Sequence, residues 1–197
     1  MSRHARFTVQ GKPFLSLGGQ THNSSSYFVD ELQTAWKSVK AMGGNTVATP
    51  MPWDAFEPVE GQYNRKLVTD IIDAARAQDL HLVFLWFATW KNATMEYCPG
   101  WVKLDQQRFP RVQCRDGNVV ANLSPHYEGN RDADARAFCE LMRTLKDYDG
   151  DTQTVIAVQV ENEPGYRGGT RRDFSPYGEA AWKQPVPQAL IDYAKAH

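Results

Sequence analysis

Apolar residues follow two spacings along this chain, and segments with one spacing alternate with segments of the other. Four short runs are rich in apolar and β-branched residues and are bounded by turn residues, as strands are. They cover residues 12–19, 45–50, 81–87 and 154–160. The third run, HLVFLWF, is apolar almost throughout, which indicates a strand covered on both faces.

Helical spacing separates and follows these runs. Apolar side chains recur every three or four positions in residues 29–44, in 64–80, in a stripe from Phe138 to Leu145, and from Pro187 onward. Asn64 is placed to cap the second of these helices. A long polar and aromatic connection over 88–130 follows the third strand.

Strands that alternate with helices predict an α/β fold whose parallel strands are joined by right-handed crossovers. Two architectures fit this order, an open doubly wound sheet and a (β/α)8 barrel. No glycine-rich phosphate loop follows any of the runs, which argues against a nucleotide-binding open sheet. No low-complexity linker divides the chain, so residues 1–197 are expected to belong to a single domain.

Residues that can bind or react follow the predicted strand ends. In either architecture, functional groups gather at the carboxyl ends of the strands. We call this group the mouth, and it comprises His22, Trp53, Trp90, Lys91, Asn92, Glu161, Asn162 and Glu163. The charge that ends the fourth strand is therefore expected at a binding edge and not in a core.

The fourth strand runs into the triplet Glu161-Asn162-Glu163. Period-two alternation predicts both glutamates on one face, about 6–7 Å apart along the backbone. A carboxylic acid beside another carboxylate in an apolar setting has a raised pKa, which suits a general acid. The alternative is that both glutamates cap the strand end and bond neighbouring backbone, but such a triplet at the end of a buried strand favours function.

Tryptophans are the second indication of chemistry. Aromatic faces stack on the apolar side of sugar rings, while carboxylates and amides bind the hydroxyls. Trp53 and Trp90 share loops with polar residues and are the ligand candidates, whereas Trp36 is expected to pack on its helix. His22 serves either a ligand hydroxyl or the bracing of its own loop. Paired carboxylates with tryptophans indicate glycoside hydrolysis, in which an acid and a second carboxylate flank the scissile bond.

Composition removes several other classes of function. The formal net charge is -1, so no nucleic-acid partner is expected. No apolar stretch reaches the length of about 20 residues that spans a bilayer, so no membrane partner is expected. The three cysteines and the histidines lack metal-ligand spacing, and no metal or other cofactor is expected.

The start, MSRHARFTVQ, has no apolar signal core. This predicts a cytoplasmic protein, or a periplasmic or secreted one if a signal was trimmed.

Three segments then indicate a family. GGNTVATPMPWDAFEPVEGQYN resembles the second-strand segment of glycoside hydrolase family 35 β-galactosidases, and VQVENEPG resembles the fourth-strand motif of that family. LVFLWFATWKNATMEYCPGWVK is similar to the bacterial branch of the family. The resemblance runs from Phe14 to about Ala194, with the motifs in the expected order.

The resemblance implies a (β/α)8 TIM barrel that releases terminal β-linked galactose, with retention, from oligo- or polysaccharides. Glu163 matches the acid/base residue, Asn162 the adjacent amide that contacts the sugar, and Glu161 a supporting or sugar-binding carboxylate. Lys91 and Asn92 stand where many relatives have an Ala-Glu pair that contacts the sugar, so this contact is altered.

Length limits what the chain holds. A (β/α)8 barrel takes about 250 residues, whereas the pattern here covers only about the first four βα units of such a barrel. The family nucleophile is a glutamate at the end of strand seven and is expected outside this chain. Two hypotheses follow: the N-terminal half of a β-galactosidase barrel, inactive by itself, or a non-catalytic carbohydrate-binding half-barrel fragment. Open barrel edges at strands one and four predict self-association.

Overall fold

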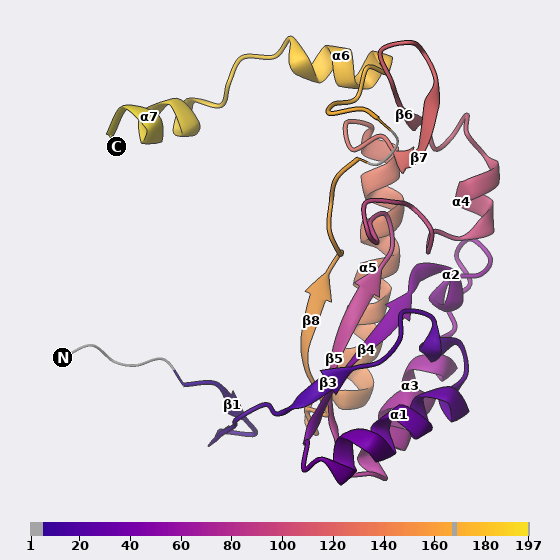
Figure 1. Cartoon of the computed structure of the whole chain (residues 1–197), viewed down its shortest axis with the longest axis vertical. Coiled ribbons are helices and arrows are strands. Elements are labelled where there is room, and N and C mark those ends of the chain that lie inside the picture. The colour runs from indigo at the N-terminus through magenta and orange to yellow at the C-terminus, as the bar shows by residue number, and fades with distance from the viewer. Residues whose placement is uncertain (1–5, 167–168, 197) are drawn as a thin grey trace.

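A parallel sheet forms the centre of the molecule. The computed structural model describes residues 6–166 and 169–196. The sheet has four strands in the order β3-β4-β5-β8, all parallel. They are β3 (Gly18–Gln20), β4 (Thr46–Pro52), β5 (His81–Phe87) and β8 (Val155–Val160). Because the strands are parallel, their carboxyl ends meet at one edge, the upper edge in Figure 1.

The first predicted strand has the wrong bounds. Residues 12–19 do not form one strand: β1 (Thr8–Val9) and β2 (Lys12–Pro13) make a separate antiparallel hairpin, and the sheet strand β3 begins only at Gly18. A Cβ atom at Gly18 would lie 1.6 Å from the carbonyl oxygen of Thr46, so only glycine fits where the chain joins the sheet.

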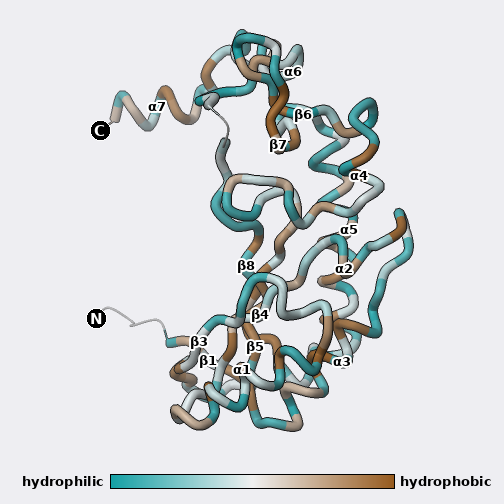
Figure 2. The backbone as a smooth tube through the Cα atoms, turned by 45° about the vertical axis from the view of Figure 1, so that its right-hand side comes forward, coloured by the Kyte–Doolittle hydropathy of each residue, from teal (hydrophilic) through white to brown (hydrophobic). Residues whose placement is uncertain are grey.

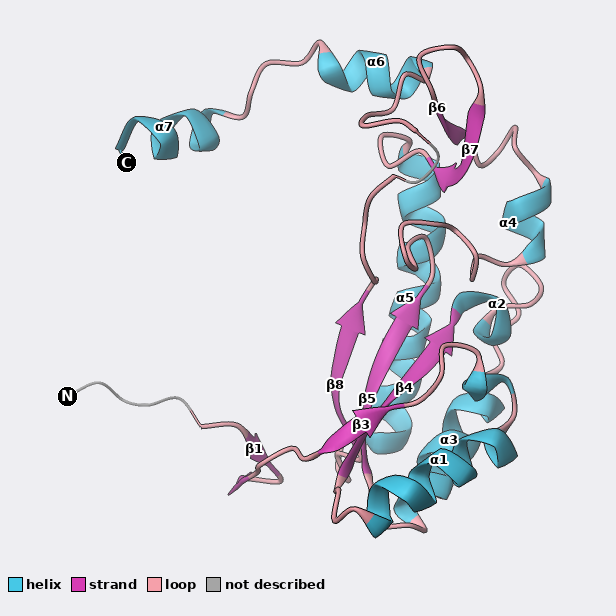
Figure 3. Cartoon of the chain, in the orientation of Figure 1, coloured by secondary structure: helices cyan, strands magenta, loops and turns pink. Residues whose placement is uncertain are grey.

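Three long helices cover one face of the sheet (Figure 3). They are α1 (Val29–Ala41), α3 (Arg65–Arg76) and α5 (Glu128–Asp149). As predicted, Asn64 caps α3, because its side chain accepts a hydrogen bond from the backbone of Leu67 at 3.1 Å. Trp36 of α1 is fully buried in the core that these helices form with the sheet, which confirms the expected packing.

Strand β5 is buried on both faces, as its sequence predicts. Leu82 and Phe84 belong to the main core on the helix side, while Leu85 and Phe87 form a smaller cluster with Tyr97 on the opposite side. Figure 2 shows hydrophobic residues along the central strands.

Shorter helices and strands lie around the mouth and in the C-terminal part of the chain. The predicted connection over 88–130 contains more structure than its sequence indicates. The shorter elements are η1 (Ser25–Tyr27), α2 (Trp53–Phe56), α4 (Gly100–Leu104), β6 (Arg111–Gln113), β7 (Val119–Leu123), α6 (Pro176–Trp182) and α7 (Gln188–Ala196). Strands β6 and β7 pair as an antiparallel hairpin. Helix α7 has no buried residue and points away from the sheet (Figure 1).

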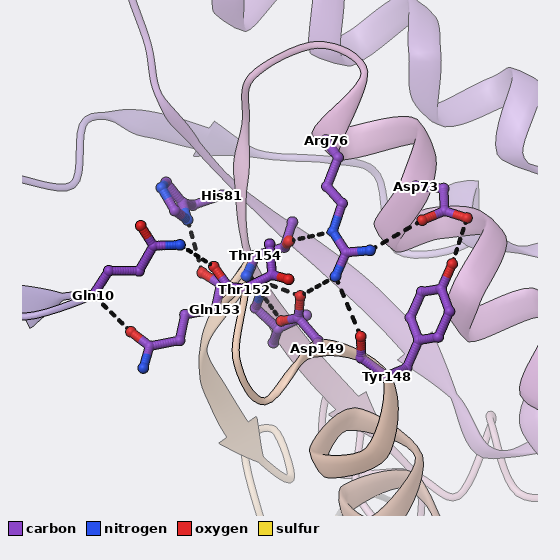
Figure 4. A network of polar contacts seen from close by, with 10 residues as sticks. Gln10, Asp73, Arg76, His81, Tyr148, Asp149, Thr152, Gln153 and Thr154 are labelled. Carbon is purple, nitrogen blue, oxygen red and sulfur yellow. Dashed lines mark hydrogen bonds and ion pairs between the residues drawn. The ribbon is translucent and has the colours of Figure 1, made fainter.

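A polar network joins α3, α5 and the start of β8 at the lower end of the sheet (Figure 4). Arg76 donates to Thr154 Oγ1 at 2.8 Å and to Asp149 Oδ1 at 2.7 Å. Asp149 also accepts from the backbone of Thr154 at 3.0 Å and of Val155 at 2.7 Å. This end of the sheet is therefore fixed by charge-assisted hydrogen bonds.

None of the helices in the described ranges combines the length and the apolar character that crossing a membrane requires.

Candidate active site

Two turns at the carboxyl edge of the sheet form the centre of the mouth. One follows β5 and the other follows β8, and their backbones bond to each other. Asn162 N donates to Trp90 O at 3.2 Å, and Ala93 N donates to Glu163 O at 3.0 Å. Asn122, at the end of β7, donates to Ala93 O at 2.7 Å. Residues far apart in the sequence are thus held as one unit.

The prediction that Glu161 and Glu163 share one face of an extended strand is wrong. Strand β8 ends at Val160, and the backbone φ angles are 63° at Glu161 and 51° at Glu163. Non-glycine residues adopt such left-handed angles only where surrounding contacts impose them, and here the bonds between the two turns do so. Strand alternation therefore stops before the first glutamate.

Glu161 turns toward the helix side and lies beside Asp134 of α5. Burial, the negative charge of Asp134 and a hydrogen bond with Asp134 together raise the pKa of Glu161 to about 10. Glu161 Oε2 accepts from Trp90 N at 2.7 Å. The carboxylate neighbour of Glu161 is thus Asp134 and not Glu163, and the contacts of Glu161 favour the supporting alternative over sugar binding.

Asp134 holds the same turn from beneath. It accepts hydrogen bonds from Trp86 Nε1 at 2.8 Å and from Thr89 N at 3.1 Å, and a further one from the hydroxyl of Thr89. A protonated Glu161 can donate its proton to Asp134 in the hydrogen bond that joins the two carboxyl groups.

Glu163 is exposed in its turn, and its neighbour Asn162 is half-buried. The carboxamide oxygen of Asn162 accepts from Lys91 Nζ at 2.9 Å, and Asn92 Oδ1 accepts from the same ammonium at 2.8 Å. An exposed carboxyl group on a rigid turn, beside an amide, can exchange a proton with a bound oxygen atom.

The two tryptophans predicted to contact a sugar lie in different environments. Trp90 is half-buried at the mouth, where its ring lies 6.2 Å from that of Tyr166 and it lines a cavity of about 320 Å³ with Glu161. Trp53 is fully buried, and its Nε1 donates to Glu57 Oε2 at 2.7 Å. The predicted sugar contact of Trp53 is wrong, because the core encloses its ring.

His22 lies exposed after β3, and its Nδ1 accepts from Ser24 N at 3.4 Å. Of the two alternatives for His22, this contact corresponds to bracing its own loop. Among the described residues, no group of three or more histidine, cysteine, aspartate or glutamate side chains is placed to hold a metal ion.

The sequence analysis missed Asp134 and Asn122, which hold the turns of the mouth. Asp134 left a signal, since it is a charged residue on the buried stripe of α5 that also contains Ala133 and Ala137. Asn122 left none, because its strand lies in a segment that the sequence pattern predicts to be a loop.

Comparison with known proteins gives the family. The model of the glycosyl hydrolases family 35 matches residues 6–194. The chain belongs to glycosyl hydrolase family 35. Within curated proteins, it is 29% identical over 167 residues to a β-galactosidase of Xanthomonas manihotis. It is 26% identical over 172 residues to a β-galactosidase of Canis lupus familiaris.

These matches cover 81% and 82% of this family 35 chain but only 25% and 23% of the two relatives. The chain therefore spans about a quarter of the length of these relatives.

Two solved glycosidases share the fold. An exo-β-1,4-mannosidase, Op5Man5 from Opitutaceae bacterium strain TAV5, superposes with a TM-score of 0.55 at 19% identity, over 78% of this chain and 26% of that one. A β-galactosidase of Halorubrum lacusprofundi superposes with a TM-score of 0.57 at 18% identity, over 76% of this chain and 21% of that one. The family 35 chain thus has a TIM-barrel-like α/β fold.

Proposed function

We propose that this chain carries the acid/base residue of a retaining glycoside hydrolase that releases terminal β-linked galactose from oligo- or polysaccharides. The observation that carries the proposal is the exposed carboxyl group of Glu163, held by the bonds between the two turns of the mouth next to Asn162. Family membership and the two β-galactosidase relatives support the substrate class.

In the proposed reaction, Glu163 donates its proton to the glycosidic oxygen as the bond from that oxygen to the anomeric carbon breaks. A second carboxylate attacks the anomeric carbon and forms a covalent glycosyl intermediate. Glu163, now a carboxylate, takes a proton from the water that releases the sugar. Asn162 binds a sugar hydroxyl, Trp90 contributes an aromatic face, and Glu161 keeps the turn in place.

We further propose that the nucleophile lies outside this chain, which would comprise about the first four βα units of a (β/α)8 barrel of the bacterial branch. The late carboxylates already have other partners. Asp173 is buried and accepts from Ser124 Oγ at 2.6 Å, and Glu179 pairs with Arg172 at 2.6 Å. Asp192 accepts from Gln188 at 2.7 Å on α7.

An external anion can replace the missing nucleophile and so tests the role of Glu163. Azide attacks the anomeric carbon of phenyl β-galactoside, the bond to the phenol oxygen breaks, and Glu163 protonates that oxygen, giving α-galactosyl azide and phenol. We expect no hydrolysis without azide, and formation of this product with azide. Glu163→Gln should lose at least about 100-fold of the azide reaction, because acid catalysis contributes on that order.

The matched control is Glu128→Gln, an exposed glutamate at the start of α5, which should leave the azide reaction unchanged. A Glu163→Gln variant that reacts as fast as the parent would contradict the acid role. Retaining hydrolysis without azide would instead mean that the nucleophile lies in this chain.

The second candidate is a non-catalytic carbohydrate-binding fragment. The contacts of Asp173 and Glu179 favour this alternative, because both carboxylates already have partners and neither is free to attack an anomeric carbon. Binding of methyl β-galactoside without any azide reaction would decide for this alternative.

We also propose that the chain self-associates through β8. In the described residues, β8 pairs only with β5, and its outer edge is open. Val160 on this strand is 60% exposed. An unpaired apolar edge pairs readily with the same edge of a second copy.

A further inference from the structure

Lys91 is a buried cation at the mouth. It lies in the turn after β5 and is only 5% exposed. Its ammonium donates to Asn92 Oδ1 at 2.8 Å and to Asn162 Oδ1 at 2.9 Å, and it lies 4.5 Å from the centre of the Phe87 ring. Lysine is rarely buried unless its charge has partners.

A charge buried at this position costs desolvation free energy. Burial lowers the pKa of Lys91, while the negative charges of Glu163 and Glu96 act in the opposite direction. Methionine has a similar length and would pack against Phe87 with no charge to desolvate. The function of the ammonium is therefore to be sought in the residues that it binds.

The ammonium determines how the Asn162 carboxamide is oriented. A carboxamide has an acceptor end and a donor end, whereas a lysine ammonium has donors only. Lys91 can therefore bind only the oxygen, which turns the Nδ2 amino group of Asn162 away from it. The backbone of Asn162 is fixed at the same time by its bond to Trp90 O at 3.2 Å.

We propose that Lys91 is a positioning residue, which holds Asn162 so that its amide nitrogen is presented to a sugar hydroxyl beside Glu163. Lys91 acts through Asn162 and does not itself touch the sugar. The contact between Lys91 and Asn162 stands independently of the proposed function, whereas the effect on sugar binding rests on it.

The contact is tested first by NMR without sugar. In the parent chain, the side-chain amide of Asn162 should be ordered on the nanosecond timescale, as measured by its ¹⁵N heteronuclear NOE. In Lys91→Met it should become mobile while backbone signals of the sheet stay in place. Lys37→Met, at an exposed position on α1, is the matched control and should change nothing.

An Asn162 amide that stays ordered in folded Lys91→Met would overturn the inference. If the methionine variant does not fold, Lys91→Gln takes its place, since its side chain is only one bond shorter and keeps a donor without the charge. Its glutamine can bind either end of the carboxamide, so two Asn162 orientations are expected, and a single ordered orientation would overturn the inference.

A double-mutant cycle then tests the effect on binding. The affinity for methyl β-galactoside should fall about tenfold in Lys91→Met, equivalent to about 1.4 kcal/mol. In the Asn162→Ala background, the same substitution should change affinity less than twofold. Equal losses in both backgrounds would overturn positioning through Asn162. Absence of binding to the parent chain would contradict the proposed function, while the NMR result decides the Lys91 contact.

Discussion

At the scale of single residues, two neighbouring carboxyl groups hold the turn that follows β5. Glu161 and Asp134 lie together beneath the turn after β5, and each accepts hydrogen bonds from the backbone of that turn. The raised pKa of Glu161, about 10, means that the folded chain keeps it protonated at neutral pH. The backbone N–H of Trp90 therefore donates to a neutral carboxylic acid.

This pair predicts how stability depends on pH. The unfolded chain releases the Glu161 proton above the usual pKa of 4.5, whereas the folded chain keeps it until about 10. The free energy of unfolding should therefore be highest below pH 4.5 for this group and fall as pH rises toward 10, by at most about 1.4 kcal/mol per pH unit. Urea unfolding at pH 5.5, 7 and 8.5 measures the slope.

Glu161→Gln is the informative variant, because glutamine resembles the protonated acid. At pH 8.5 its free energy of unfolding should be at least as large as that of the parent, and this free energy should depend less on pH. A parent whose stability does not fall between pH 5.5 and 8.5 would show that Glu161 is not protonated as expected.

At the scale of elements, the two ends of the sheet differ in structure. The upper ends of β5 and β8 lead into turns with left-handed residues, which are costly but present functional groups. The lower ends are held by the network of Arg76 and Asp149, which connects α3, α5 and β8 (Figure 4).

Asp149→Ala should destabilise the fold by about 3 kcal/mol, because it leaves the Arg76 charge and the backbone N–H groups of Thr154 and Val155 without their buried partner. Thermal or urea unfolding measures this loss. Asp151→Ala, at an exposed position two residues away, is the control and should have little effect. Equal stability of the two variants would contradict a structural role for the network.

At the scale of the whole molecule, helices cover one face of the sheet, and among the described residues neither edge strand has a partner on its outer side. Helices α1, α3 and α5 cover a single face, and β3 and β8 end the sheet at its two edges. A groove beside the open β8 edge lies between α5 and β8. Its apolar lining includes Phe138 and Met142 of α5 and Val158 of β8.

Self-association is therefore the prediction at this scale. Light scattering coupled to size-exclusion chromatography should find dimers or larger species at micromolar concentration. Val160→Lys should shift the chain toward monomer, because a charged edge residue opposes strand pairing. Val59→Lys changes a valine that is 51% exposed and lies outside the sheet, and it should leave the association unchanged. A parent chain that is monomeric at micromolar concentration would contradict the proposal.

The sequence by itself determined three of the four sheet strands, the helices between them and the family resemblance, but not the first strand or the elements within 88–130. The run of His81–Phe87 predicts β5 with the bounds that the structure has, and Asn64 predicts the cap of α3. Periodicity and capping depend on neighbours a few residues away, which the sequence states directly. Strand ends also identified the segments of the mouth, because parallel strands bring their carboxyl ends to one edge.

Only the tertiary structure decided which way each side chain of the mouth points. Lys91 binds Asn162 across 71 positions of sequence, and Trp86 binds Asp134 across 48. Such contacts depend on how turns leave their strands, and the left-handed angle at Glu161 reverses what strand alternation predicts. The burial of Trp53 also could not be predicted locally, because it depends on elements that pack over this residue from distant parts of the chain.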